Sequence, residues 1–217
     1  MTEPFEDRVE AGRELGRRLK EEYGGRSDVL VLGLPRGGVP VAREVARILE
    51  APLDVLVVRK LGSPFQPELA FGAIAAAGER YIDREMVERI GLAEEQVEEI
   101  VAREREELRR REKEFRGERG ELPVAGRTVI VVDDGVATGA TLRAALRVLG
   151  ESEAERVVAA VPVAPSESLD VLEEEADQVI CLRTPEPFLA ISPHYRSFPQ
   201  TSNDEVRRLL DGARAAR

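Results

Sequence analysis

The 217-residue sequence has one cysteine, one histidine and no tryptophan. Because Cys181 is alone, the chain cannot form an intrachain disulfide, and we expect it to occupy the reducing cytoplasm. One histidine and one cysteine do not supply the usual ligand sets of a zinc site. A serine hydrolase would have to use His194, and the chain has no G-x-S-x-G turn for its nucleophile. Disulfide scaffolds, zinc proteins and hydrolases of this type are therefore excluded.

Long apolar runs and an excess of positive charge are also missing. No apolar run reaches the roughly 20 residues needed to span a bilayer, and the N-terminus is charged from its third residue, unlike a secretory signal. The chain carries 32 basic and 42 acidic residues, a net charge of -10. Because nucleic-acid surfaces need clustered positive charge, we expect no nucleic-acid partner and no membrane contact. An anionic ligand would have to be held by local groups.

Short aliphatic runs alternate with amphipathic segments along most of the chain, as is typical of parallel α/β proteins. The aliphatic runs predict strands that are buried on both faces, and the amphipathic segments predict the helices between them. The predicted fold class is α/β, with a doubly wound, mostly parallel sheet in a single domain over residues 1–217. The expected strands are 28–33, 53–58, 128–134, 156–163 and 177–182, and the expected helices are 40–50, 140–150 and 168–176.

Residues 83–120 do not follow this alternation. They are dense in glutamate and arginine, and only a thin apolar stripe of Val97, Val101, Leu108 and Phe115 runs along the expected helix. So narrow a stripe favours a charged helical insertion with a solvated surface. The alternative is an arm that packs on a second subunit, which would make the protein a homodimer.

The segment VIVVDDGVATGAT, residues 129–141, ends an aliphatic strand on two aspartates and continues with small residues. In a doubly wound sheet, ligands bind beyond the carboxyl ends of the strands, where Asp133 and Asp134 fall. Adjacent carboxylates need polar partners there, which sugar hydroxyls or the water shell of a metal would supply. The loop that follows exposes backbone N–H groups before a helix and adds the hydroxyls of Thr138 and Thr141, which suits a phosphate. A ribose 5-phosphate carries both groups.

Other phosphate-binding motifs do not match this loop. The Walker A pattern needs lysine after its last glycine, where this chain has Ala140, and the dinucleotide pattern G-x-G-x-x-G is absent. The remaining alternative is an ordinary turn in which Thr138 only caps the next helix. That alternative does not explain the paired aspartates, so we favour a ligand site.

A second glycine-containing turn follows the first expected strand. Within LGLPRGGVPVA, residues 32–42, Pro35, Arg36, Gly37 and Gly38 separate the strand from a helix. Glycines let the backbone approach a ligand, and the forked guanidinium of Arg36 suits phosphate oxygens. The alternative is an ordinary strand-to-helix turn with a surface arginine, since glycine is common in turns.

Residues 129–141 resemble the signature of the type I phosphoribosyltransferases, which is a hydrophobic strand, an acidic pair and a small-residue loop with Thr-Gly. The resemblance implies that Asp133 and Asp134 hold the ribose hydroxyls of 5-phosphoribosyl 1-pyrophosphate (PRPP). It implies that residues 35–38 are the pyrophosphate loop. It also implies a 5-phosphate loop made of Ala137, Thr138, Gly139, Ala140 and Thr141.

The resemblance also gives a role to residues 57–78. Arg59 and Lys60 stand at the end of an expected strand there, and a stretch broken by glycine and proline follows them. In the family, a flexible loop at this place closes over PRPP. We therefore expect residues 60–71 to be a mobile lid, with Lys60, Ser63 and Glu68 as its candidate contacts.

Near the C-terminus, three of the nine aromatic residues of the chain crowd into one irregular segment. In the family a small hood holds the base, and residues 183–203 correspond to it. The implied base pocket consists of Phe188, Tyr195 and Phe198. The alternative is simple packing of these rings under a loop.

The implied activity is the displacement of pyrophosphate from PRPP by a ring nitrogen of a base, with Mg²⁺ held mainly by PRPP near the acidic pair. The expected catalytic residues are Asp133, Asp134, Arg36 and Lys60. Purine-salvage members usually carry an acidic residue where this chain has Ala137, so the base is left open. The alternatives are a non-catalytic sensor of PRPP or nucleotides on the same fold, and a structural protein that uses the charged insertion.

Overall fold

The computed structural model describes residues 3–64, 69–75, 80–117, 120 and 122–215. Its centre is a five-stranded sheet in the order β2-β1-β6-β7-β8, and every neighbouring pair of strands is parallel. The predicted α/β class with a mostly parallel sheet is confirmed. The strands are β1 (Val29–Gly33), β2 (Leu53–Val55), β6 (Thr128–Val132), β7 (Arg156–Val163) and β8 (Gln178–Arg183).

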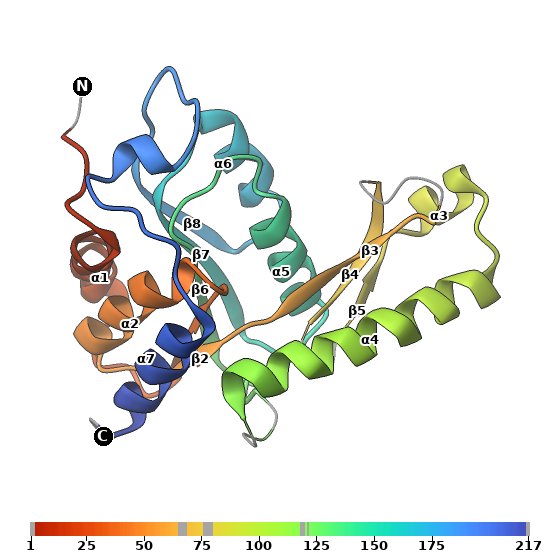
Figure 1. The fold of residues 1–217 in the computed structure, drawn as a ribbon, viewed down its shortest axis with the longest axis horizontal. Coiled ribbons are helices and arrows are strands. Elements are labelled where there is room, and N and C mark those ends of the chain that lie inside the picture. Colours follow the sequence, from red (N-terminus) through yellow and green to blue (C-terminus); the bar gives the residue numbers. More distant parts are fainter. Residues whose placement is uncertain (1–2, 65–68, 76–79, 118–119, 121, 216–217) are drawn as a thin grey trace.

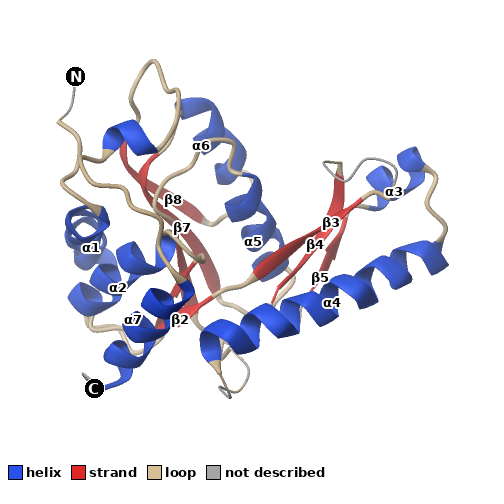
Figure 2. Cartoon of the chain, in the orientation of Figure 1, coloured by secondary structure: helices blue, strands red, loops and turns tan. Residues whose placement is uncertain are grey.

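Helices cover both faces of this sheet (Figures 1 and 2). Successive residues of a strand point to opposite faces, so Val29 and Val31 enter one core while Leu30 and Leu32 enter the other. The strands are mostly aliphatic because each one serves two cores. One face is covered by α1 (Arg8–Tyr23), α2 (Gly38–Leu49) and α7 (Asn203–Ala215), and the other by α5 (Ala140–Gly150) and α6 (Ser166–Glu173). No helix in the described ranges is both long and apolar enough to cross a bilayer.

A second sheet lies beside the first and is antiparallel, with strands β3 (Val58–Gly62), β4 (Ala70–Ala75) and β5 (Arg80–Ile82). The prediction of one strand at 53–58 is therefore wrong. The central strand ends at Val55, and the chain crosses to the second sheet through Leu56 and Val57, which are also buried. Since the crossing is as apolar as the strands, the sequence shows no break there. Arg59 and Lys60 consequently lie within β3 and not at the end of a core strand.

The predicted lid belongs to this antiparallel sheet. Lys60 in β3 pairs with Ala73 in β4, and the Ser63 N–H donates to the Leu69 carbonyl oxygen at 2.9 Å. The expectation of an irregular stretch is thus wrong for both ends of the segment, which are strands. Glu68 lies outside the described residues. Closure of the segment over a ligand stays a prediction.

The charged insertion forms α3 (Arg84–Ile90) and α4 (Glu94–Arg116). Figure 1 shows α4 running along the antiparallel sheet to the neighbourhood of α7. Its apolar stripe, which includes Val97, Leu108 and Phe115, is buried in the same core cluster as residues of β3, β4 and α7. The stripe is therefore covered by this chain itself, while the charged face is solvated as predicted. A homodimer stays a prediction.

Ion pairs attach α4 to the strands, and two of them involve partly or fully buried arginines. Arg59 in β3 donates to Glu104 through Nε and Nη2, at 3.0 and 2.5 Å. Arg116, at the end of α4, has a side chain that is 2% exposed, and its Nε and Nη2 each lie 3.1 Å from a carboxylate oxygen of Asp54 in β2. Arg116 also donates to Glu112 and to the Gly120 carbonyl oxygen. A buried guanidinium with this many acceptors fixes the end of α4 against the central sheet.

We expect Arg116→Met to lower the free energy of unfolding by on the order of 3 kcal/mol, because it removes the cation that two partly buried carboxylates share. Arg84→Met is the matched control, since the Arg84 and Glu94 side chains are 59% and 57% exposed. An exposed pair of this kind contributes no more than about 1 kcal/mol. Urea unfolding of both variants measures the difference, and equal losses would contradict the role assigned to Arg116.

Candidate functional site

The two predicted ligand loops meet at one edge of the central sheet. Asp133 and Asp134 follow β6, and the turn at residues 35–38 follows β1, its parallel neighbour. Parallel neighbours end at the same edge, so the two loops are brought together. A Cβ on Gly37 would lie 2.0 Å from Oδ2 of Asp134, and one on Gly38 would lie 2.6 Å from the Val132 carbonyl oxygen. Both positions therefore require glycine for contact with the acidic pair.

Asp134 is buried and ion-paired. Nε and Nη2 of Arg8, in the first turn of α1, each lie 2.8 Å from its Oδ2. The two side chains are only 10% and 12% exposed. The hydroxyl of Tyr195 donates to the Asp134 carbonyl oxygen, so main chain and side chain are both held. One charge of the acidic pair is thus neutralised within the protein.

Arg8 is a site residue that the sequence does not reveal. Its Nη1 donates to the Pro199 carbonyl oxygen at 2.6 Å, and its guanidinium carbon lies 3.8 Å from the centre of the Phe198 ring. These contacts join the N-terminal helix, the acidic pair and the C-terminal segment. In the sequence, Arg8 is one of several arginines in a charged helix, and only the tertiary structure buries it.

Asp133 is less buried than its neighbour Asp134. It is half-buried, and its Oδ1 accepts the backbone N–H of Asp134 at 2.9 Å. Burial and the negative charge of Asp134 raise the pKa of Asp133 well above its ordinary range. A ligand that donates hydrogen bonds or brings positive charge would stabilise the ionised form. Asp133 is therefore the carboxylate of the pair with the most to gain from a ligand.

The loop at residues 135–139 is anchored at Val136 and Ala137. The Val136 N–H donates to the Val163 carbonyl oxygen at 2.8 Å, and the Ser168 hydroxyl donates to the Ala137 carbonyl oxygen at 2.7 Å. Gly139 then takes a positive φ of 72° directly before α5. Anchors on β7 and α6 hold the loop in place at the start of α5.

The first turn of α5 is uncovered. Its N-cap Gly139 makes no side-chain capping bond, and Thr138, Ala140 and Thr141 are exposed. The alternative role of Thr138 as a simple helix cap is therefore not observed. Backbone N–H groups and two hydroxyls face outward where a phosphate oxygen could accept their hydrogens.

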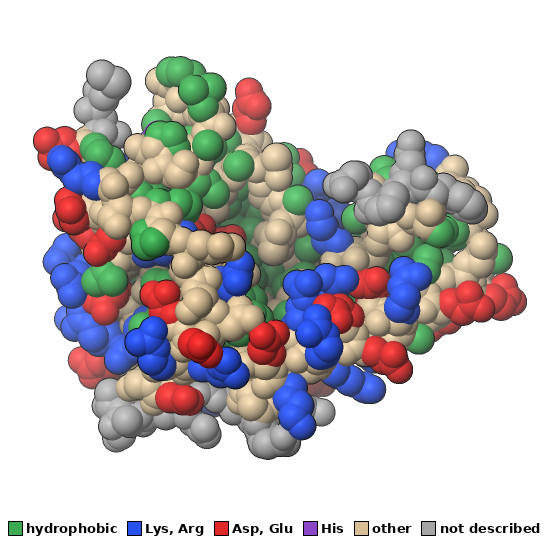
Figure 3. Space-filling view, viewed as in Figure 1, with side chains coloured by type: hydrophobic (Ala, Val, Ile, Leu, Met, Phe, Trp, Pro, Cys, Tyr) green, Lys and Arg blue, Asp and Glu red, His purple; other side chains and the backbone are tan. Residues whose placement is uncertain are grey.

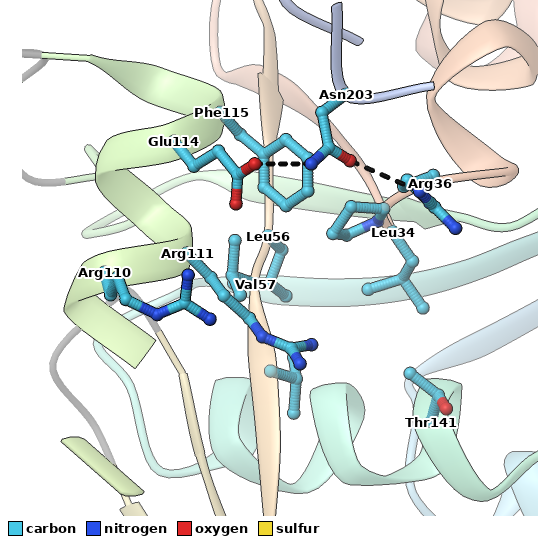
Figure 4. Close-up of a pocket in the computed structure, with 12 residues that line it drawn as sticks. Leu34, Arg36, Leu56, Val57, Arg110, Arg111, Glu114, Phe115, Thr141 and Asn203 are labelled. Atoms are coloured by element: carbon cyan, nitrogen blue, oxygen red, sulfur yellow. Dashed lines mark hydrogen bonds between the residues drawn. The ribbon is translucent and has the colours of Figure 1, made fainter. Parts of the chain in front are cut away.

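Arg36 lines a cavity of about 510 Å³ between the central sheet and α4. Figure 3 shows the hollow between the two lobes of the molecule, with lysine and arginine side chains along its rim. Arg36 is exposed, and its Nη1 lies 3.4 Å from Oδ1 of Asn203. The lining residues are Leu34, Pro35, Arg36, Leu56, Val57, Val58, Arg110, Arg111, Glu114, Phe115, Thr141 and Asn203 (Figure 4).

Lys60 does not line the cavity that contains Arg36. It lines a smaller cavity of about 180 Å³ together with Tyr81, Ala140 and Arg143. The structure therefore does not bring Lys60 and Arg36 into one cavity. Both cavities reach the first residues of α5, through Ala140 in one case and Thr141 in the other.

The aromatic residues of the C-terminal segment take different positions. Tyr195 is 5% exposed and packs between Phe5 and Phe198, with ring centres 5.5 and 4.8 Å away. Its ring has no open face for a base, so we assign it to the support of Asp134. Phe188 is half-buried and stacks on His194 at 5.3 Å. A base pocket remains a prediction for Phe188 and Phe198.

Similarity to known proteins extends over nearly the whole chain. The profile of the phosphoribosyl transferase domain matches residues 4–193. A protein from two strains of Mycobacterium tuberculosis, named provisionally a phosphoribosyl transferase, is 50% identical over 209 residues, which are 96% of this chain. Those residues are 47% of the relative, so this chain spans about half the length of the curated relatives it matches.

Solved structures show the same fold. The crystal structure of TT1426 from Thermus thermophilus is 40% identical in sequence, with a TM-score of 0.86 over 95% of this chain and 97% of that one. The AQ2163 protein from Aquifex aeolicus is 15% identical, with a TM-score of 0.50 over 94% of this chain and 84% of its own. The second likeness concerns the fold alone.

Gly37→Ala should lower the free energy of unfolding by on the order of 1–3 kcal/mol, because its Cβ would push on the buried Asp134 carboxylate. Gly150→Ala is the control, since a Cβ at that exposed position at the end of α5 would meet nothing within 4 Å. It should leave stability unchanged or raise it by up to about 1 kcal/mol. Thermal unfolding compares the two, and a neutral Gly37→Ala would show that the turn does not press on Asp134.

Asp133→Asn should raise the free energy of unfolding at neutral pH. The folded-state pKa of Asp133 is raised above its unfolded value of about 3.9, so ionisation disfavours the folded protein as the pH rises through the folded pKa. Asparagine keeps the Oδ1 acceptor and cannot ionise. Its advantage over the wild type should therefore disappear below about pH 4. Urea unfolding between about pH 3.5 and 8 tests this, and a difference that does not vary with pH would refute it.

Proposed function

The chain belongs to the phosphoribosyl transferase domain family, and from that premise we propose that it transfers the phosphoribosyl group of PRPP to a nitrogenous base, releasing pyrophosphate. The observation that carries the proposal is the contact of the turn at residues 35–38 with the Asp133 and Asp134 pair. Carboxylates for a diol, a cationic turn and an uncovered helix N-terminus lie at one edge of the sheet. These are the groups needed for the ribose, the pyrophosphate and the 5-phosphate of one PRPP molecule.

In this assignment each loop meets one part of PRPP. Asp133 accepts hydrogen bonds from the ribose hydroxyls, beside an Asp134 whose charge is matched by Arg8. The N–H groups of residues 137–141 and the exposed Thr138 and Thr141 hydroxyls bind the 5-phosphate. Arg36 meets the pyrophosphate in the cavity beside α4. The ribose carbon that reacts would then lie between the acidic pair and Arg36.

The chemical step would be the loss of pyrophosphate from the ribose carbon as a base nitrogen bonds to it. Positive charge develops on the sugar and negative charge on the leaving group, so Arg36 stabilises the transition state more than the ground state. Asp133 and Asp134 contribute by holding the sugar in one orientation. Exclusion of water protects the sugar from hydrolysis, which is the function proposed for a lid over residues 60–71 with Lys60 at its root.

Mg²⁺ is the proposed cofactor. Within the described residues, no three His, Cys, Asp or Glu side chains are grouped so as to hold a metal ion. We propose that substrate oxygens supply most of the ligands of the ion, and that Asp133 is the protein carboxylate nearest to it. When bound, Mg²⁺ would add positive charge to the pyrophosphate.

The accepting base is proposed only by class, as a nitrogen heterocycle. Phe188 offers a half-buried ring on the C-terminal segment, and aromatic faces stack on bases, whereas the Phe198 ring already contacts Arg8 and Tyr195. Ala137 provides no charged contact to a base. A sensor that binds PRPP without reaction would use the same loops, and turnover separates the two functions.

The proposal predicts pyrophosphate release when PRPP and Mg²⁺ are supplied with one member of a panel of purine and pyrimidine bases. Arg36→Ala should weaken the binding of PRPP and of pyrophosphate by about 10- to 100-fold, one lost charge-assisted contact, and leave ribose 5-phosphate unchanged. Asp133→Asn with Asp134→Asn should remove binding of PRPP and ribose 5-phosphate. Calorimetry measures the affinities.

Arg13→Ala is the matched control, since Arg13 lies on the surface of α1 and pairs only with Glu44 among the described contacts. It should change no affinity. PRPP binding without release of pyrophosphate for any base would assign the sensor function. An unchanged PRPP affinity in the double aspartate variant would exclude both functions.

A further inference from the structure

The cavity that Arg36 lines has a second basic wall. Arg110 and Arg111, near the end of α4, also line it. Figure 4 shows the guanidinium of Arg111 extending from α4 toward the cavity, while Arg36 lies on the loop after β1 at the opposite side, beside Asn203. Thr141, in the first turn of α5, closes a third side. Three arginines thus line one cavity, although Arg36 is far in the sequence from Arg110 and Arg111.

We propose that Arg110 and Arg111 form the second half of a diphosphate site, so that the diphosphate group of the ligand binds between Arg36 and α4. This inference rests on the proposed function, because the ligand is PRPP and its product pyrophosphate. It assigns the charged insertion to substrate binding. Guanidinium groups suit this ligand because their planar forks bind phosphate oxygens in pairs.

Asn203 connects the two walls through hydrogen bonds. The Asn203 side chain accepts from Arg36 Nη1 and donates through Nδ2 to Glu114 Oε1 at 2.5 Å, which links the loop to α4. Phe115, the next residue, is 8% exposed in the core, and Arg116 is bound to Asp54 of the central sheet. The cavity is therefore built by α4 as part of the folded chain.

The charges around the cavity favour an anion. Arg36, Arg110 and Arg111 outnumber the nearby carboxylates, which are the lining Glu114, hydrogen-bonded to Asn203, and Glu107, which pairs with Arg110 and Arg111. The other lining residues are mostly apolar, including Leu34, Leu56 and Phe115. A basic rim over an apolar floor concentrates the electric field inside the cavity and strengthens the attraction for a polyanion.

Glu107 orients the two arginines and takes up only part of their donors. Arg110 donates to it through Nε and Nη2, at 2.8 and 2.7 Å, and Arg111 through Nε alone, at 2.9 Å. Hydrogen bonds from these two arginines lower the pKa of Glu107 to about 2, so it is ionised at neutral pH. Among the described contacts, the terminal nitrogens of Arg111 remain available to phosphate oxygens.

The test compares two double variants with the same change of charge. Arg110→Gln with Arg111→Gln removes the proposed wall, and Arg105→Gln with Arg109→Gln removes two exposed arginines of α4 that do not line the cavity. Calorimetry with inorganic pyrophosphate and with ribose 5-phosphate is carried out at about 0.15 M salt, where exposed charges are largely screened beyond about 8 Å. Thermal unfolding shows that each variant is folded, and Arg111→Gln alone serves as a milder change.

We expect the cavity variant to weaken pyrophosphate binding by at least about 10-fold and ribose 5-phosphate by less than about 2-fold. The surface variant should change both by less than about 2-fold. Equal losses in the two variants, or no pyrophosphate binding by the wild type, would overturn the inference. Loss of pyrophosphate affinity in the cavity variant without any turnover of PRPP would support this site while refuting the proposed enzyme. Turnover of PRPP by the wild type, with unchanged pyrophosphate affinity in the cavity variant, would support the proposed enzyme and refute this site.

Discussion

The buried ion pair between Arg8 and Asp134 is the interaction on which the site depends. Two adjacent carboxylates at the end of a buried strand repel each other and lose hydration, so one of them needs a partner inside the protein. Arg8 supplies it at 2.8 Å. The same guanidinium lies against the Phe198 ring and donates a hydrogen bond to the Pro199 carbonyl oxygen. The N-terminal helix, the strand end and the C-terminal segment therefore meet at one buried charge.

Neutralisation of one aspartate leaves the other for a ligand. Asp133 is half-buried with its ionisation opposed, while Asp134 is held by Arg8, by Tyr195 and by the close approach of Gly37. Hydrogen bonds from a diol, or the charge of a cation, would stabilise the ionised form of Asp133. That arrangement agrees with the family to which the chain belongs, and it explains why glycine is needed in the facing turn.

The charged insertion has two different faces for two purposes. Its apolar stripe covers the antiparallel sheet and α7, and Arg116 anchors its end on β2. The residues just before that anchor, Arg110 and Arg111, line the cavity opposite Arg36. Anchoring and ligand binding therefore act through the same two turns of α4, since a wall that moved could not hold a phosphate group at a set distance from Arg36.

The parallel sheet could be predicted from the sequence, because mostly aliphatic runs suit strands covered on both faces. The sequence also located the acidic pair and both glycine loops, since each is a contiguous motif at a strand end. The break between β2 and β3 could not be predicted, because the chain changes sheet through the buried apolar residues Leu56 and Val57, which look like a continued strand in the sequence. The roles of Arg8, Tyr195, Asn203 and the α4 arginines were decided only by the tertiary structure. They come from segments distant in the chain, and an arginine in a charged helix has the same local sequence whether it is buried, lines a cavity or faces solvent.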